Sequence, residues 1–413
     1  MRLQPVRGTR DILADEAARH RRVVETAREV AQRYGYAEIS TPIFEFTEVF
    51  QRTLGETSDV VTKEMYTFED RGGESITLRP EGTAGIARAL ISGGLSQNLP
   101  LKCFYDGPMF RYERPQKGRY RQFHQIGVEL LGPGDPHADV EVIALGAHIL
   151  EELGLAGKTV LELNSLGDGE SRAKYGDVLV SYFRDHESAL SHDSKVRLQR
   201  NPLRILDSKD EGDRKIVANA PLFEESFNQA STDFFAGVCA GLDALEVTYK
   251  VNRRLVRGLD YYCHTAFEFV TNELGAQGTV IAGGRYDGLV EIMGGQPTPG
   301  TGWAGGIERL ALLLDSVPVA PRPVAIIPVG DAGEGPAARI ANELRHAGYT
   351  VELGYRGNVG RRMKRANKLN ARAAVFLGED ELARGAAKVR DLDSGEEVDV
   401  PLGDLAGALE KYR

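Results

Sequence analysis

The chain has 413 residues, more than one hydrophobic core usually organises, so two or three domains are expected. Its composition, 42% hydrophobic and 27% charged, is that of a globular protein. The formal net charge of -9 excludes a uniformly basic nucleic-acid coat, and any RNA contact must use local basic patches.

The cysteines and the apolar runs indicate the compartment. Cys103, Cys239 and Cys263 are odd in number and widely spaced, so they form neither a disulfide framework nor a zinc motif. No apolar run has membrane length, and the start, MRLQPVRGTRD, lacks a signal-peptide core. We expect a cytoplasmic protein without membrane or DNA partners.

The first elements in chain order are a long helix and a strand. Apolar residues at helical spacing predict a helix over residues 15–34, and Gly35 stops it. Residues 39–50, ISTPIFEFTEVF, are predicted to form a strand. Its Pro42 removes a ladder donor, which places the strand at a sheet edge or a subunit boundary.

A short strand and a helix follow at residues 75–90. SITLRP is the predicted strand, and EGTAGIARAL begins the helix, with Pro80 suited to a first helical position. Glu81 and Thr83 would then lie where free backbone N–H groups gather. A second amphipathic helix is predicted over residues 138–153, stopped by Gly154.

Between these helices, residues 110–130 are predicted to form a hairpin around the loop 114–121. One face is apolar and reads as core: Phe110, His124, Ile126, Val128 and Leu130. The other face carries both signs of charge, an aromatic ring and a glycine: Arg111, Glu113, Phe123, Gln125, Gly127 and Glu129. That face suits the floor of a polar ligand site, although a solvent-facing hairpin alternates in the same way.

In the second half of the chain the predicted secondary structure changes twice. Residues 171–248 read as a helical insertion, and strands are predicted to resume near Glu268. The stretches 282–288 (AGGRYDG) and 294–306 (GGQPTPGTGWAGG) are predicted as glycine-rich turns before an apolar helix at 307–314. Beyond the linker 316–323, strands and helices alternate, which predicts a small α/β domain with parallel pairing.

Arginines and a short aromatic segment are the candidates for chemistry. Arg111, Arg257 and Arg309 lie beside glycines or polar strand ends, where a guanidinium can hold phosphate or carboxylate. A surface salt bridge is the commoner role for any one of them, and the glycine-rich stretches favour ligand binding for the three together. In RGLDYYCHTAFE, residues 257–268, a phenol such as that of Tyr262 could join Glu129 in contacting both nitrogens of a neutral imidazole. No Walker motif GxxxxGK[ST] is present, and GGRYDG is not GxGxxG, so a P-loop or Rossmann nucleotide site is not supported.

These segments together resemble one family. FRYERPQKGRYRQFHQ is similar to motif 2 of class II aminoacyl-tRNA synthetases, RGLDYYCHTAFE resembles the histidine-specific signature of the histidyl-tRNA synthetases, and GTGWAGGIERL resembles motif 3. LRPEGT, NPLRILDSK and FLGEDELARG also match. The resemblance covers essentially the whole chain. It implies a class II catalytic domain on an antiparallel sheet at 1–320 and an anticodon-binding α/β domain at 321–413.

The resemblance implies a two-step ligase reaction. Histidine and ATP would give histidyl-adenylate and pyrophosphate, and histidine would pass to the terminal ribose of its tRNA. Magnesium is expected with ATP, without assigned ligands. By resemblance, Arg111 and Arg257 would contact the α-phosphate, and Arg309 the γ-phosphate. Phe123 would stack on adenine, and Glu113 and Arg119 would hold the nucleotide.

The resemblance also implies which residues would contact the amino acid and the tRNA. Glu81, Thr83 and Gln125 would bind the amino and carboxylate groups of histidine. The imidazole subsite would comprise Gly127, Glu129, Tyr261, Tyr262 and Tyr286. Contacts to tRNA fall to Arg114, Gln116, Lys117, Arg361 and Arg362, of which the last two belong to an acid-free run, RRMKRANK, that could also be a solvated helix face. A homodimer is also implied.

Three alternatives remain to be compared. A synthetase-like regulatory subunit of ATP phosphoribosyltransferase would lack the α/β domain after Pro323. A class II synthetase for another amino acid would not need RGLDYY. A generic RNA-binding module would leave the mixed-charge hairpin face unexplained.

Overall fold

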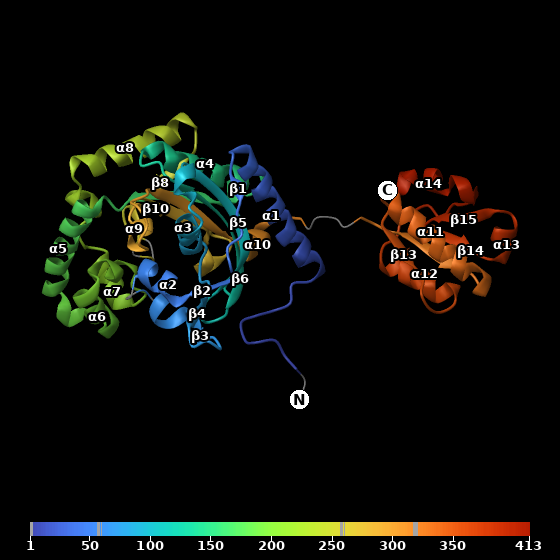
Figure 1. Cartoon of the computed structure of the whole chain (residues 1–413), viewed down its shortest axis with the longest axis horizontal. Coiled ribbons are helices and arrows are strands. Elements are labelled where there is room, and N and C mark those ends of the chain that lie inside the picture. Colours follow the sequence, from blue (N-terminus) through green and yellow to red (C-terminus); the bar gives the residue numbers. More distant parts are fainter. Residues whose placement is uncertain (1–2, 56–57, 59, 257–258, 260, 317–320) are drawn as a thin grey trace. The chain divides into compact units, whose positions relative to one another are not determined.

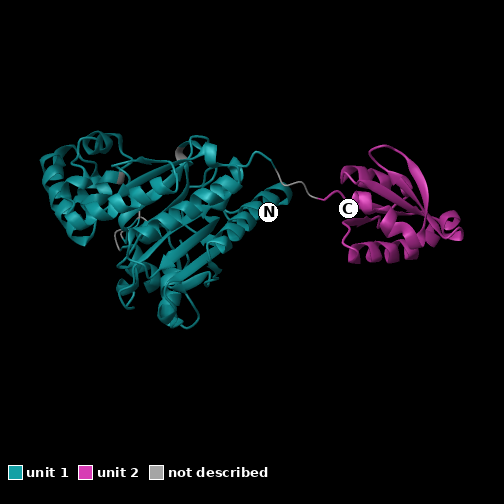
Figure 2. Ribbon diagram, turned by 90° about the horizontal axis from the view of Figure 1, so that it is seen from above, with its two compact units in different colours: residues 1–318 teal, residues 319–413 magenta. Residues whose placement is uncertain are grey.

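The computed structural model describes residues 3–55, 58, 60–256, 259, 261–316 and 321–413. By internal contacts the chain divides into two compact units, Met1–Pro318 and Val319–Arg413 (Figure 2). In the described residues no helix combines the length and apolar character needed to cross a membrane.

An eight-stranded sheet forms the centre of unit 1, with the order β1-β5-β6-β11-β10-β9-β7-β8. In that order the strands are β1 (Ala37–Glu38), β5 (Leu101–Phe110), β6 (Gln122–Leu131), β11 (Gly300–Gly306), β10 (Thr279–Arg285), β9 (Cys263–Val270), β7 (Val160–Ser165) and β8 (Tyr249–Val251). The neighbours from β5 to β7 pair antiparallel, and only the two outermost pairs are parallel. The predicted antiparallel α+β architecture is confirmed.

The two faces of this sheet bury different cores because successive side chains alternate. Phe104 and Val128 belong to the core that includes buried residues of α1 (Ala14–Arg33), α4 (Pro136–Glu152), α8 (Gln229–Ala244) and α10 (Ile307–Leu313). Tyr105 and Tyr262 belong to the core shared with α3 (Thr83–Ser92). The polar residues of the hairpin lie on this second face.

A second, three-stranded sheet has the order β2-β4-β3, from β2 (Phe44–Phe46), β4 (Ser75–Leu78) and β3 (Tyr66–Glu69). The predicted strand over 39–50 is wrong for most of its length, because Thr47 begins α2 (Thr47–Leu54). The predicted edge position is correct for β2. Pro80 is not the first helical residue, since α3 begins at Thr83 with Gly82 as its N-cap.

Each glycine-rich segment is partly strand and only partly the predicted turn: residues 282–285 belong to β10 and residues 300–306 to β11, whereas residues 286–288 and 294–299 lie outside both strands. Their glycines are needed where backbones and a carboxylate approach closely: a Cβ on Gly283 would lie 2.1 Å from the carbonyl oxygen of Gly302. A Cβ on Gly302 would lie 1.9 Å from Oε2 of Glu129. Composition alone suggested turns, whereas the glycines actually make room inside a paired sheet. A short helix, α9 (Leu289–Ile292), connects these two strands.

The insertion is helical, as predicted. It comprises α5 (Gly169–Asp185), α6 (His192–Arg200), α7 (Glu211–Val217) and α8, and the first three lie together at one end of unit 1 (Figure 1). Strands resume earlier than expected, with β8 at Tyr249 and β9 at Cys263. The short polar β8 lacks the apolar pattern that would have revealed it.

Unit 2 is a five-stranded α/β domain with the order β13-β12-β14-β15-β16. The strands are β12 (Val324–Pro328), β13 (Val351–Leu353), β14 (Ala373–Leu377), β15 (Ala386–Asp391) and β16 (Glu397–Pro401), and the helices are α11 (Glu334–His346), α12 (Val359–Lys368), α13 (Glu379–Ala383) and α14 (Leu405–Ala408). The predicted parallel pairs are present. The antiparallel additions β15 and β16 were not predicted.

Candidate active site

A cavity of about 260 Å³ lies in unit 1 over the polar face of the β5–β6 hairpin. Its lining comprises Glu81, Thr83, Arg111, Glu113, Gly118, Arg119, Tyr120, Phe123, Gln125, Leu259, Tyr261, Tyr262, Glu268, Thr279, Val280, Ala282, Trp303, Ala304, Gly306, Glu308 and Arg309. Most of the predicted ligand residues therefore share one cavity. A larger cavity of about 610 Å³ is lined mainly by the insertion and shares only Leu259 with it.

Two predicted phosphate arginines enter the cavity from different elements. Arg111 follows β5, and its Nε donates to the carbonyl of Pro80 at 2.9 Å. Arg309, on α10, donates through Nε to Gly118 O at 3.0 Å and through Nη1 to Thr279 O at 2.7 Å. These bonds fix both guanidinium planes before any ligand arrives, which is the preorganisation that a developing negative charge requires.

The other predicted nucleotide residues form a charged pair beside them. Arg119 Nη2 donates to Oε1 of Glu113 at 2.8 Å. Burial opposes the charge of Glu113, but the hydrogen bond from Arg119 and the nearby Arg111 outweigh it and lower the pKa of the carboxyl. Phe123 lies next to this cluster, with its ring centroid 5.4 Å from the Arg111 guanidinium carbon. A flat apolar surface thus adjoins three cations.

Glu81 and Thr83 lie at the start of α3, as predicted. The Glu81 carboxylate accepts from the backbone N–H of Thr83 at 2.6 Å and of Ala84 at 2.8 Å. Burial raises the pKa of Glu81, and these backbone hydrogen bonds oppose the rise. Gln125 lies nearby on the cavity wall, and its Oε1 is buried without a hydrogen-bond partner among the described residues. The unused acceptor indicates room for a donor from a ligand.

Glu129 is buried behind the cavity, only 1% exposed. Its Oε1 accepts from the Thr83 hydroxyl at 2.6 Å, and its Oε2 accepts from the Tyr286 hydroxyl. Burial raises the pKa of Glu129 to about 8, and these two hydroxyl hydrogen bonds limit the rise. Tyr262, predicted to contact an imidazole together with Glu129, lines the cavity.

Gly127 faces a neighbouring ring and does not line the cavity. A Cβ there would lie 2.3 Å from Cζ of Tyr105, its partner across the β5–β6 pair. The Tyr105 ring is 4% exposed and also occupies the space beside Gly82. A side chain at position 127 would displace this buried aromatic ring, so Gly127 makes room for Tyr105.

Three tyrosines lie close together at the wall of the cavity and behind it. Tyr261 and Tyr262 line the cavity, with ring centroids 4.6 Å apart. Tyr286 lies behind them and meets Tyr261 edge to face at 5.7 Å. All three are at most 7% exposed, so this part of the site is enclosed by aromatic rings.

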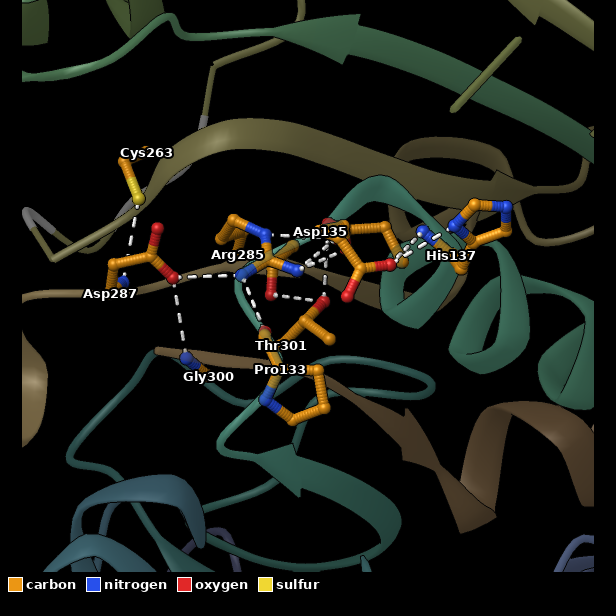
Figure 3. A network of polar contacts seen from close by, with 10 residues as sticks. Pro133, Asp135, His137, Cys263, Arg285, Asp287, Gly300 and Thr301 are labelled. Carbon is orange, nitrogen blue, oxygen red and sulfur yellow. Dashed lines mark hydrogen bonds and ion pairs between the residues drawn. The ribbon is translucent and has the colours of Figure 1, made fainter. Parts of the chain in front are cut away.

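A buried polar network fixes the strand end that carries Tyr286 (Figure 3). Arg285 and Asp139 are fully buried and paired, and Asp287 accepts from Arg285 Nη1 at 2.9 Å. Burial disfavours the charge of Arg285, but Asp139 and then Asp287 raise its pKa overall. This network ties β10 to α4 and to β11, where Gly300 N donates to Asp287. No local sequence pattern predicts this network, because Asp139, Arg285 and Gly300 lie far apart in the chain.

A second contact missed from sequence joins motifs 2 and 3. The backbone N–H of His124 donates to the Glu308 carboxylate at 3.0 Å, and His124 Nδ1 lies 2.9 Å from Oε1. His20 adds a third potential ligand atom within 4.8 Å. Two imidazoles and one carboxylate do not suit Mg²⁺, which prefers oxygen ligands. In the sequence, only the position of Glu308 directly before Arg309 in IERL pointed to a role for this carboxylate.

The remaining predicted residues that the structure describes do not line the cavity. Arg257 lies outside the described residues. Arg114, Gln116 and Lys117 are exposed in the loop between β5 and β6. On α12 in unit 2, Arg361 is exposed, whereas Arg362 is only 8% exposed and donates to Pro328 O and to Glu334. Arg362 therefore stabilises its own domain and is removed from the expected RNA contacts.

Comparisons with known proteins cover the whole chain. The family model described as "Histidyl-tRNA synthetase" matches residues 8–167 and 188–310, and "Anticodon binding domain" matches 323–412. A histidine–tRNA ligase of Rhodospirillum rubrum is 63% identical over 411 residues, covering 99% of each chain. One of Gluconobacter oxydans is 59% identical, covering 100% of this chain and 99% of that one. The crystal structure of apo Staphylococcus aureus histidyl-tRNA synthetase has a TM-score of 0.83 at 35% identity, covering 98% of this chain and 99% of that one.

Proposed function

The chain belongs to the histidyl-tRNA synthetase family, and we propose that the cavity over the β5–β6 hairpin joins histidine to ATP before histidine is transferred to tRNA. The observation that carries this proposal is one cavity whose lining brings together two hydrogen-bonded arginines, the unpartnered acceptor of Gln125 and two tyrosines. Such a cavity fits a polyphosphate on one side and a small amino acid on the other.

Activation needs no nucleophilic side chain, because the carboxylate of histidine attacks the α-phosphorus and the bond to pyrophosphate breaks. Arg111 lines the cavity and would stabilise negative charge on the α-phosphate. Arg309, held by Gly118 and Thr279, would hold the leaving pyrophosphate end. Phe123 offers a stacking surface for adenine, and the Glu113–Arg119 pair borders it. Positioning thus supplies most of the catalysis.

Histidine would bind at the tyrosine end. Its ammonium group fits the carboxylate of Glu81 and the unpartnered Oε1 of Gln125. The imidazole would point toward Glu129, Tyr262 and Tyr286, where a buried carboxylate and phenols can pair a ring N–H and a ring nitrogen. Glu129 is enclosed in the free chain, so we expect the tyrosine end to open by small side-chain shifts when histidine enters.

Further parts of the proposal concern metal, tRNA and assembly. ATP would bring Mg²⁺, which neutralises phosphate charge. The exposed loop bearing Arg114, Gln116 and Lys117 would contact the acceptor end of tRNA, and Arg361 the anticodon end. A cytoplasmic location is part of the proposal.

We also propose a homodimer through the surface around β2 and β3. Ile43, Phe44, Phe46 and Phe68 are 43% to 58% exposed there, an unusual concentration of large apolar side chains. Sedimentation of wild-type chain beside a Phe44→Glu/Phe46→Glu double variant tests this surface. Loss of the dimer only in the variant supports it, and a monomeric wild-type chain refutes it.

The regulatory-subunit alternative is disfavoured by the complete unit 2 and by full-length ligase relatives. The proposal is tested by charging tRNA with labelled histidine. Acid-precipitable label that requires ATP, tRNA and the protein supports both reaction steps. Absence of label under conditions in which the protein is folded would refute the proposed ligase activity.

A further inference from the structure

Three side chains with metal-binding atoms converge in unit 1 where α1 and α10 pack against β6. His20 comes from α1, His124 from β6 and Glu308 from α10. One ligand atom of each residue lies within 4.8 Å of the other two. The two imidazole rings meet edge to face, with centroids 5.9 Å apart. The fold therefore gathers two imidazoles and one carboxylate from elements that are far apart in the chain.

His20 carries a ring nitrogen that the protein does not use. Its Nε2 is buried and has no hydrogen-bond partner among the described residues. A buried polar atom without a partner is costly and calls for a missing one. Burial lowers the pKa of His20 more than the nearby Glu308 raises it, so the ring is neutral and keeps a lone pair on one nitrogen. The neutral imidazole is the form that binds metal ions.

Glu308 is oriented by hydrogen bonds before any ion arrives. Its side chain is only 5% exposed, and the backbone N–H of His124 donates to both carboxylate oxygens at 3.0 Å. Oε1 also lies 2.9 Å from Nδ1 of His124. An ion bound at Oε1 would leave the hydrogen bond to Oε2 in place. Carboxylates that bind metal ions are commonly held by such a further hydrogen bond.

The helix that carries His20 is docked independently of the cluster. Arg19, the preceding residue, donates to two backbone carbonyls at the end of α10, at 3.3 Å and 3.1 Å. Glu16, one turn earlier on α1, is paired with Arg10. The position of α1 is thus fixed without an ion, and the nearest further carboxylate on that helix is already engaged.

We propose that His20, His124 and Glu308 bind one divalent transition-metal ion of the zinc class, with water as the fourth ligand. Zinc accepts imidazole nitrogens and carboxylate oxygens at about 2.0–2.2 Å, in a tetrahedron whose ligand atoms are about 3.4 Å apart. Side-chain shifts of about 1 Å close the cluster to that spacing. The bound ion links α1 to the start of α10, the helix that carries Arg309. It is distinct from the Mg²⁺ that accompanies ATP, because Mg²⁺ prefers oxygen ligands.

Co²⁺ probes the site directly, because its visible spectrum reports tetrahedral coordination by nitrogen and oxygen. The full chain, stripped of metal with EDTA, should bind one Co²⁺ and develop visible absorbance. Zn²⁺ should displace the Co²⁺, whereas millimolar Mg²⁺ should not. Zn²⁺ at about a hundred times its dissociation constant should raise the melting temperature reported by Trp303 by roughly 5 °C, because an ion that binds only the folded state stabilises it.

Variants of His20 test the ligand assignment. His20→Gln removes the imidazole but keeps a polar side chain, and it should abolish both the Co²⁺ spectrum and the zinc-dependent rise in melting temperature. His20→Phe keeps a ring of similar size and should give the same two losses, so a packing defect in one variant does not decide the result. Both should retain histidine-dependent ATP–pyrophosphate exchange without added zinc, because His20 does not line the active-site cavity.

His148→Gln is the matched control. His148 lies 3.5 Å from Glu152 on α4, and it belongs to no three-ligand cluster within the described part of the chain. This variant removes an imidazole beside a carboxylate elsewhere in unit 1, and both metal responses should persist.

The proposal is refuted if the stripped wild-type chain gives neither the Co²⁺ spectrum nor the zinc-dependent shift, or if both responses persist in the two His20 variants. Displacement of Co²⁺ by Mg²⁺ would also refute it, since that result indicates an oxygen-only site. Loss of both responses in His148→Gln would place the ion on α4 instead. None of these results bears on the proposed ligase function, because metal uptake and melting are measured without ATP or tRNA.

Discussion

Replacing Glu129 with glutamine separates the energetic role of this carboxyl from its role in recognition. In the folded chain burial raises the pKa of Glu129 to about 8, compared with an ordinary value of 4.5. Between these pH values the folded state keeps a proton that the unfolded state releases, so stability falls as pH rises. Each pH unit costs about 1.4 kcal/mol, which gives roughly 4 kcal/mol between pH 5 and pH 8. Glutamine cannot ionise and removes this slope.

The glutamine also introduces a constant penalty. Its amide nitrogen cannot accept the hydroxyl of Thr83 or of Tyr286, so one buried donor loses its acceptor at a cost of about 1–3 kcal/mol. The variant should therefore be the less stable protein at pH 5 and the more stable one at pH 9. All other titrating groups are shared and cancel in the difference between variant and wild type.

Urea unfolding followed by Trp303 fluorescence measures this difference. Trp303 is the only tryptophan and lies buried in the sheet of unit 1, so it reports on the unit that contains Glu129. The same variant should lose histidine use by up to roughly 10⁴-fold while its ATP affinity changes little. Parallel stability curves for variant and wild type across pH 5–9 would refute the buried-carboxyl reasoning. Equal losses for histidine and ATP would refute the assignment of Glu129 to the amino acid.

Four further predictions address other parts of the chain. Gly127→Val should destabilise unit 1 by about 1–3 kcal/mol or more, since its Cβ meets the buried Tyr105 ring, and an unchanged urea midpoint would contradict this. Arg309→Lys should raise the KM for ATP more than that for histidine, because one ammonium cannot replace the bonds to Gly118, Thr279 and Gln277, and steady-state exchange kinetics would show it. Arg361→Glu should weaken tRNA binding with adenylate formation intact, whereas Arg362→Ala should lower the melting temperature of unit 2, and the reverse pattern would contradict the different burial of the two residues. Asp139→Asn should destabilise unit 1 by roughly 3–5 kcal/mol, because it leaves buried Arg285 underpaired, and calorimetry showing wild-type stability would refute this.

The predictions from sequence succeeded where one local pattern decides the structure. Alternating residues in the hairpin identified both faces correctly, and Ile126 and Val128 lie in the core while Gln125 lines the cavity. The use of Glu81 was found because a carboxylate near free N–H groups accepts from them, although α3 begins only at Thr83. The resemblance named the residues around the cavity. It could not predict how their side chains pack against one another.

The failures share one cause, which is contact between distant segments. The glycines of β10 and β11 looked like turn residues, because nothing local shows that Gly302 must clear Glu129. Gly127 looked like ligand space, because its neighbour across the sheet, Tyr105, is 22 residues earlier in the chain. Arg362 looked like its neighbour Arg361 until the helix was placed against β12.

The measurement that tests the central claim most directly is ATP–pyrophosphate exchange with each of the twenty amino acids. The cavity combines fixed phosphate arginines with an enclosed carboxylate and phenols that suit an imidazole. Exchange should therefore depend on histidine and exceed the rate with every other amino acid by orders of magnitude. Exchange that is absent with histidine, or equally fast with another amino acid, would contradict the account.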